Sequence, residues 1–92
     1  MRLLERKDIN DVLAKSLMDI SIVSGCKVET ENIVVMVQYL KEAIKTQFYS
    51  LDEETYYKAV KNGCTGLYGD YAGVSVKNIC SWVRAEIGNR TN

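Results

Sequence analysis

The residue types that most often carry catalysis or bind metals are scarce in this 92-residue chain. It has no histidine, so it lacks the side chain that most often moves protons near neutral pH and ligates metals. Its three cysteines, Cys26, Cys64 and Cys80, form no Cys-x-x-Cys pair and lack the further ligands that a zinc site needs. We therefore expect reduced thiols that pack as small apolar side chains, with no metal and no cofactor.

A cluster of carboxylates, Asp52, Glu53 and Glu54, is the other candidate for chemistry. Adjacent positions on a helix point in different directions, so these side chains are not expected to converge on a metal or a substrate. Acids favour the positive end of a helix dipole, and Ser50 with Glu53 has the spacing of a capping box. An enzyme would need a carboxylate pair or an activated cysteine, so we expect a non-enzymatic protein.

Four glycines, Gly63, Gly66, Gly69 and Gly73, precede the last predicted helix. A phosphate-binding loop is not predicted, because no Gly-Lys-Ser/Thr follows them and no strand precedes them. The Gly-x-x-Gly pair at positions 66 and 69 is similar to the clamp of KH domains, but the β-α-α pattern around that clamp is missing.

The spacing of small and apolar residues over 65–84 resembles the helix-turn-helix of DNA-binding proteins. Gly69 is followed four residues later by Gly73, then by Ile79 and Trp82 at steps of six and three. In that motif a small residue lies where the helices cross, and the turn favours glycine because it adopts positive φ. The apolar residues of the second helix face back into a three-helix core.

The resemblance implies a short first helix over residues 67–72 and a recognition helix capped by Ser75, whose N-terminus faces DNA phosphates. Asn78 has the bidentate geometry for adenine, and Arg84 has the fork for guanine or phosphate. The implied partner is duplex DNA, and the implied contact face consists of Ser75, Val76, Lys77, Asn78, Ser81 and Arg84. Few of these residues are basic, so a monomer would bind weakly, and a homodimer would double the contacts.

A protein-interaction module is the alternative, because the same three-helix geometry also occurs in proteins that bind other proteins. Twelve basic and twelve acidic residues cancel, so no bulk charge favours nucleic acid. Tyrosines near the glycines either pack in the core or form an exposed hot spot for a protein or a stacking surface for bases. These residues are Tyr56, Tyr57, Tyr68 and Tyr71.

A longer pattern resembles the C-terminal portion of small helical proteins encoded by bacteriophages and other mobile elements. The residues that carry it are Ala59, Gly63, Gly66, Tyr68, Gly69, Tyr71, Gly73, Ser75, Ile79 and Trp82. This resemblance implies an accessory role linked to DNA replication or its regulation, and it brings no catalytic residues.

Apolar residues at helical spacing predict a first helix over 8–24, with Asp8 as its cap and Gly25 at its end. A second helix is predicted from a Thr30 cap to about residue 48. Its apolar stripe consists of Ile33, Val37, Leu40 and Ile44. The β-branched run at 33–37 also suits a strand, but the helical period continues for too long.

A third helix is expected from the Ser50 capping box to about Asn62, where Gly63 stops it, and a last helix from Ser75 to Gly88. The predicted fold is therefore all-α, a single domain over residues 1–92. Residues 8–48 supply two packing helices, and residues 50–88 form the helix-turn-helix-like unit. The two N-terminal helices, with the apolar stripe of the second, complete the core and are also a candidate dimer interface.

The N-terminal segment is charged but has no apolar run of the length found in signal peptides. The longest continuous apolar stretch, residues 33–37, is far shorter than the ~20 residues that a membrane span needs. We expect a cytoplasmic protein without membrane contact.

Overall fold

Four α-helices and a short 3-10 turn make up the described parts of the chain. The computed structural model describes residues 2–25, 28–66 and 75–91; the side chains of residues 24 and 89–91 lie outside that description. Turn η1 covers Leu3–Glu5, α1 Ile9–Ser24, α2 Thr30–Gln47, α3 Glu53–Cys64 and α4 Val76–Thr91. These residues contain no strand, which confirms the predicted all-α class.

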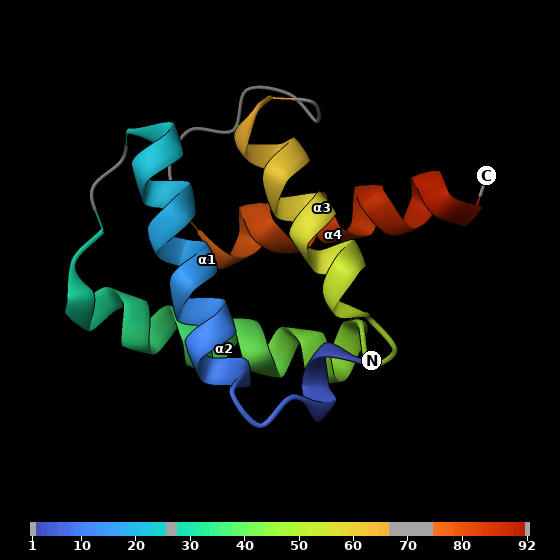
Figure 1. Ribbon diagram of the computed structural model, residues 1–92, viewed down its shortest axis with the longest axis horizontal. Coiled ribbons are helices and arrows are strands. Elements are labelled where there is room, and N and C mark those ends of the chain that lie inside the picture. The colour runs from blue at the N-terminus through green and yellow to red at the C-terminus, as the bar shows by residue number, and fades with distance from the viewer. Residues whose placement is uncertain (1, 26–27, 67–74, 92) are drawn as a thin grey trace.

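The helices pack as two crossed pairs (Figure 1). In this view α1 and α3 run side by side, α2 crosses below them, and α4 passes behind α3. Contacts join α3 to α4, α1 to α2, α1 to α3 and α2 to α4. The described start of the chain lies beside the connection between α2 and α3, whereas α4 extends outward past α3.

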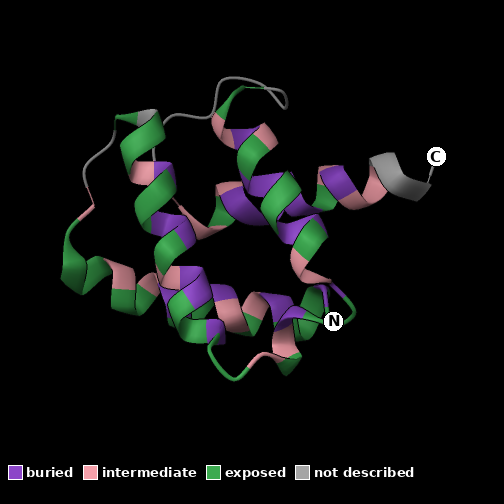
Figure 2. Ribbon diagram, in the orientation of Figure 1, coloured by how far each residue is buried: buried purple, intermediate pink, exposed green. Residues whose placement is uncertain are grey.

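A single apolar core joins all four helices and η1. Figure 2 shows that buried residues alternate with exposed ones along each helix, as expected for amphipathic helices around one core. The largest fully buried side chains are Leu3, Leu13, Leu17, Ile20, Leu40, Ile44, Tyr56, Ile79, Trp82 and Val83.

The predicted apolar stripe of α2 belongs to this core. Val37, Leu40 and Ile44 are buried, and Ile33 packs against the core from a half-buried position. The β-branched run is helical, as the long period predicted. These side chains complete the core, as predicted, and the dimer interface suggested for the two N-terminal helices stays a prediction.

Helices α3 and α4 cross where Gly63 meets the indole ring of Trp82. A Cβ atom at position 63 would lie 2.0 to 2.5 Å from three ring atoms of Trp82, closer than nonbonded atoms approach. Both residues are buried. Glycine therefore allows the flat ring to lie directly on the backbone of α3.

Arg6 connects the start of α1 to the start of α3. Its guanidinium donates two hydrogen bonds to the Asp8 carboxylate, at 2.8 and 3.0 Å, and another to Glu53. Hydrogen bonding to Arg6 lowers the pKa of Asp8 below its ordinary value. The segment just before Arg6 is fixed as well, because the Leu3 amide donates to the Leu51 carbonyl at 2.9 Å.

Three of the predicted helix caps are wrong, those of α1, α2 and α3. Asp8 precedes α1, but its side chain makes no capping hydrogen bond and instead accepts from Arg6. The capping box at Ser50 does not form, because α3 begins later and Asp52 caps it by accepting from the Thr55 amide at 2.8 Å. The Glu53 carboxylate, which the box requires, is bonded to Arg6.

The predicted helix ends are correct at one glycine and wrong at two. Gly25 ends α1 in the left-handed conformation at φ +74°, as predicted. Gly63 lies inside α3 and Gly88 lies inside α4. At the start of α2, Thr30 is a helical residue, and the cap position before it belongs to Glu29, without a side-chain capping bond.

The two internal glycines should respond oppositely to alanine. Gly63→Ala should destabilise the fold by about 1–3 kcal/mol, because the methyl group overlaps the Trp82 ring. Gly88→Ala should stabilise it by about 0.5–1 kcal/mol, because alanine favours the helix and no atom lies within 4 Å of the added methyl. Urea unfolding followed by circular dichroism measures both. Equal effects of the two substitutions would contradict this account of the crossing.

The pairing of Arg6 with Asp8 should make stability depend on acidity. The folded-state pKa of Asp8 is lowered, so its contribution exists above the unfolded value of about 3.9 and is lost as the pH falls through the lowered one. Asp8→Asn should therefore lower the urea midpoint at pH 6, and the difference from the parent should shrink as the pH falls below about 4. Asp11→Asn, an exposed acid of the same helix, is the control. If the urea midpoints of the parent and Asp8→Asn differed by the same amount across this pH range, the proposed role of Arg6 would be excluded.

Candidate nucleic-acid interface

The outward side of α4 contains two exposed cations. Lys77 and Arg84 are seven residues apart and so lie on the same side of the helix, with half-buried Ser81 between them. The opposite side of α4 carries the buried residues Ile79 and Val83. These three outward residues belong to the predicted DNA-contact face.

The start of α4 follows the prediction only in part. The Ser75 hydroxyl accepts from the Asn78 amide at 3.1 Å, which is the expected capping bond. Val76 is half-buried and packs against the core, so its assignment to the outward face is wrong. Its place on the buried side follows from its position three residues before Ile79. Asn78 is half-buried beside the capped turn.

Arg84 is held in place by the end of α2. It donates a hydrogen bond to the Gln47 side-chain oxygen at 2.8 Å. Its guanidinium carbon lies 5.8 Å from the centre of the Phe48 ring, within the range of a cation–π contact. Because the side chain remains exposed, the charge is available to a ligand although the stem is positioned.

The acidic residue of this helix faces away from the two cations. Glu86 is 8% exposed and accepts a 3.4 Å hydrogen bond from the Asn62 side chain of α3. Over the described side chains of residues 75–88, the outward side of α4 therefore carries positive charge and no carboxylate.

The first helix of the predicted motif, residues 67–72, lies outside the described residues, as do Gly69, Gly73, Tyr68 and Tyr71. The described part of the predicted unit consists of α3 and α4, which pack against each other. The helix-turn-helix itself therefore stays a prediction.

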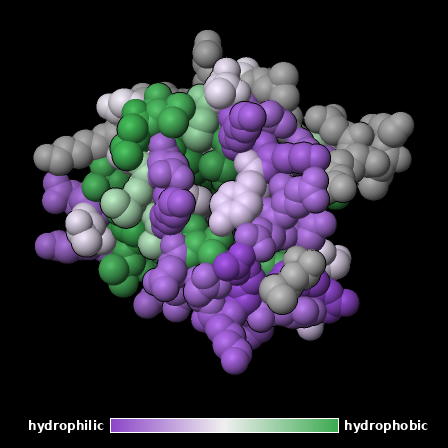
Figure 3. Space-filling model, viewed as in Figure 1, coloured by the Kyte–Doolittle hydropathy of each residue, from purple (hydrophilic) through white to green (hydrophobic). Residues whose placement is uncertain are grey.

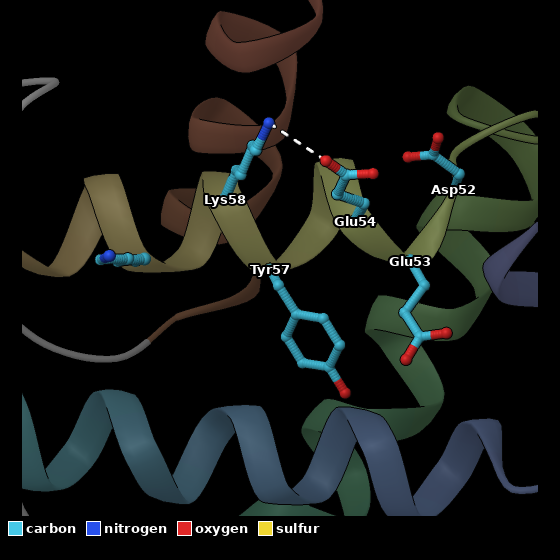
Figure 4. A pocket seen from close by; sticks show the side chains of 6 residues that line it. Asp52, Glu53, Glu54, Tyr57 and Lys58 are labelled. Carbon is cyan, nitrogen blue, oxygen red and sulfur yellow. Dashed lines mark ion pairs between the residues drawn. The ribbon is translucent and has the colours of Figure 1, made fainter.

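The two described tyrosines of the predicted cluster have different environments. Tyr56 is fully buried, and its hydroxyl shares a 2.6 Å hydrogen bond with Ser16, so its assignment to an interface is wrong and core packing is correct. Burial raises the pKa of its phenol well above the ordinary value. Tyr57 is 43% exposed and points from α3 toward α1 (Figure 4).

The carboxylates at the start of α3 do not converge, as predicted. Figure 4 shows Asp52 and Glu54 on one side of α3 and Glu53 on the other, the side of Tyr57. Each has a separate partner: Asp52 caps the helix, Glu53 bonds to Arg6, and Glu54 pairs with Lys58 at 3.2 Å. No group of His, Cys, Asp and Glu in the described residues could hold a metal ion.

The described cysteines show no sign of activation. Cys80 is buried in the core and Cys64 is half-buried, and both are reduced thiols. Burial raises the pKa of both thiols, which favours the protonated and less reactive form.

An apolar surface on α1 and α2 was not anticipated from the sequence. Its most exposed member, Ile22, has 77% of its surface open to solvent. Figure 3 shows hydrophobic residues gathered over the C-terminal half of α1 and the N-terminal half of α2. The signal in the sequence was the excess of apolar residues off the core stripe of each helix. These residues are Met18, Ile22, Val23, Val34 and Val35.

A second unanticipated feature lies at the connection between α2 and α3. The guanidinium carbon of Arg2 lies 5.3 Å from the centre of the Tyr49 ring, next to the Phe48 ring that carries Arg84. Each arginine lies far along the sequence from its ring, so no local pattern predicts either contact.

A scan against protein-family models gives no match, and searches of curated proteins and of solved structures give no significant match. Separately, none of the described helices has the length and hydrophobicity to cross a membrane. Function is therefore inferred from the surface of this chain.

The buried hydrogen bond between Ser16 and Tyr56 should be asymmetric in its energetics. Ser16→Ala removes a partner of the buried Tyr56 hydroxyl and should cost about 1–3 kcal/mol. Tyr56→Phe should cost about 1 kcal/mol, because Ser16 still donates to the Leu13 carbonyl at 2.7 Å. Urea unfolding compares the two variants. A larger loss from Tyr56→Phe than from Ser16→Ala would contradict this assignment.

Proposed function

We propose that this chain is a non-enzymatic DNA-binding protein that contacts duplex DNA through the outward side of α4. The observation that carries the proposal is the pair of exposed cations, Lys77 and Arg84, on a helix side with no described carboxylate. A single α-helix fits the major groove of B-form DNA, where such side chains reach phosphates and base edges.

The residues around the two cations support this orientation. At the N-terminus of α4 the Asn78 amide already donates to Ser75, and the positive end of the helix dipole there favours a phosphate. Asn78 and Ser81 are the candidates for base or phosphate contacts between the two charges. Arg84 loses less conformational freedom on binding, because Gln47 and Phe48 already position it.

Two cations per chain support only weak binding that is sensitive to salt. A homodimer on DNA would double this number and remains part of the proposal. The resemblance of the C-terminal pattern to accessory proteins of bacteriophages and mobile elements supports a cytoplasmic role in replication or its regulation.

Protein binding is the second candidate, and the apolar surface of α1 and α2 favours it. Ile22, Val23 and Val34 each expose more than half of their surface. Contiguous exposed apolar residues are unusual on a protein that has no partner. This surface and the outward side of α4 belong to different helices, so separate variants test them.

If α4 binds DNA through its two cations, substituting them should weaken the salt-dependent binding of duplex DNA. Fluorescence anisotropy with a labelled duplex should give a linear fall of log affinity against log salt. Lys77→Ala should make the slope shallower by about 1, and Lys77→Ala/Arg84→Ala by about 2. The reason is that binding releases about one counterion fewer from the DNA for each cation that is lost. The single variant removes charge without removing the packing of Arg84 on Phe48.

Lys7→Ala/Lys15→Ala is the matched control, since it removes the same charge from exposed positions outside α4. It should leave the slope nearly unchanged. If both double variants changed the slope equally, binding would depend on the total charge of the protein and not on the outward side of α4. The absence of duplex binding at low salt would overturn the proposal in favour of protein binding.

A further inference from the structure

Two arginines stack on neighbouring aromatic residues at the connection between α2 and α3. Arg2 lies over Tyr49, and Arg84 lies over Phe48, with 5.3 and 5.8 Å between guanidinium carbon and ring centre. We call these four residues the arginine–aromatic corner. Arg84 also belongs to the outward side of α4, so the corner continues the proposed duplex contact.

The corner is rigidly attached to the fold. The backbone of Arg2 pairs with that of Asp52, and the next amide, of Leu3, bonds to Leu51 at 2.9 Å. Phe48 is 8% exposed and anchors the connection in the core, whereas Tyr49 is 60% exposed. The exposed tyrosine ring, with a guanidinium over it, therefore projects from a segment that is anchored in the core.

A hollow of about 400 Å³ adjoins the two rings and extends to Ile87 of α4. Cavities that hold small organic ligands measure roughly 300–1,000 Å³. The wall of the hollow includes apolar surface from Ile87 and the rings, and polar atoms from Ser50 and Thr55. Neither arginine lines the hollow, and its one charged lining residue in the described parts of the chain is Asp52, so it suits the uncharged, planar part of a ligand whose anionic end lies outside it.

We propose that the corner binds an unpaired nucleotide of a DNA strand that continues from the duplex on α4. The base stacks on Tyr49, and the neighbouring phosphates contact Arg2 and Arg84. An exposed aromatic ring beside cations is the combination that retains single strands, because every base has a stacking face and every linkage carries a negative charge. This inference rests on the proposed DNA-binding function and names its substrate: duplex DNA with a single-stranded extension.

Acidic neighbours limit the affinity of the corner. Glu5 pairs with Arg2 at 3.7 Å, where it competes with a phosphate for the same guanidinium. Asp52 also borders the hollow, although its carboxylate caps α3 by accepting from Thr55. Glu5→Gln should consequently tighten binding of the extended DNA.

The test compares a blunt duplex with the same duplex carrying a short oligothymidine overhang, by anisotropy at fixed salt. The protein should bind the overhang substrate more tightly. Tyr49→Ala should weaken binding to the overhang substrate by about 5- to 100-fold, as loss of one base stack implies, and leave the blunt duplex unaffected. Tyr49→Phe keeps the ring and should keep the preference.

Tyr39→Ala is the matched control, because Tyr39 is also an exposed tyrosine, at 68%, and has no arginine over its ring in the described residues. It should bind both substrates as the parent does. Circular dichroism verifies that each variant is folded, which the exposure of both rings favours.

The outcomes separate the two proposals. Equal affinity for both substrates, with Lys77→Ala weakening both, overturns the corner and leaves the duplex contact supported. Tighter binding of the overhang substrate that requires Tyr49 but not Lys77 supports the corner and overturns the duplex contact. No binding to any of these DNAs overturns both proposals.

Discussion

The contact between Gly63 and Trp82 determines how the last two helices meet. Because position 63 has no side chain, the indole lies on the backbone of α3, and this fixes the rotation of α4 about its own axis. That rotation places Lys77 and Arg84 toward solvent and Glu86 toward Asn62. The charge pattern of the candidate interface is therefore a consequence of core packing.

The helices could be predicted from the sequence because each has a long apolar period, and periodicity reflects which side is buried. Their starts were less predictable, since several residues at each start can act as a cap. Ser50 and Asp52 can each cap the third helix, and which of them does so depends on the partner of the Glu53 carboxylate. Arg6, 47 residues away, engages that carboxylate, so a tertiary contact decides a local question.

The same limit applies to the glycines and to the site. Gly25 ends a helix for local reasons, whereas Gly63 is needed by a tryptophan 19 positions later, which no local pattern reveals. Lys77 and the Ser75 cap followed from spacing along one helix. The stacking of Arg84 on Phe48 did not, because it depends on how α2 and α4 pack against each other.

The position of Trp82 also makes the chain its own optical reporter. It is the single tryptophan of the sequence, and only 2% of its surface is open to solvent. Its fluorescence therefore reports the contact between α3 and α4, while a ligand on the outward side of α4 would not touch it. A change in emission during a titration would mean that the two helices have moved against each other, and a constant emission with bound ligand would mean that the core acts as a fixed support.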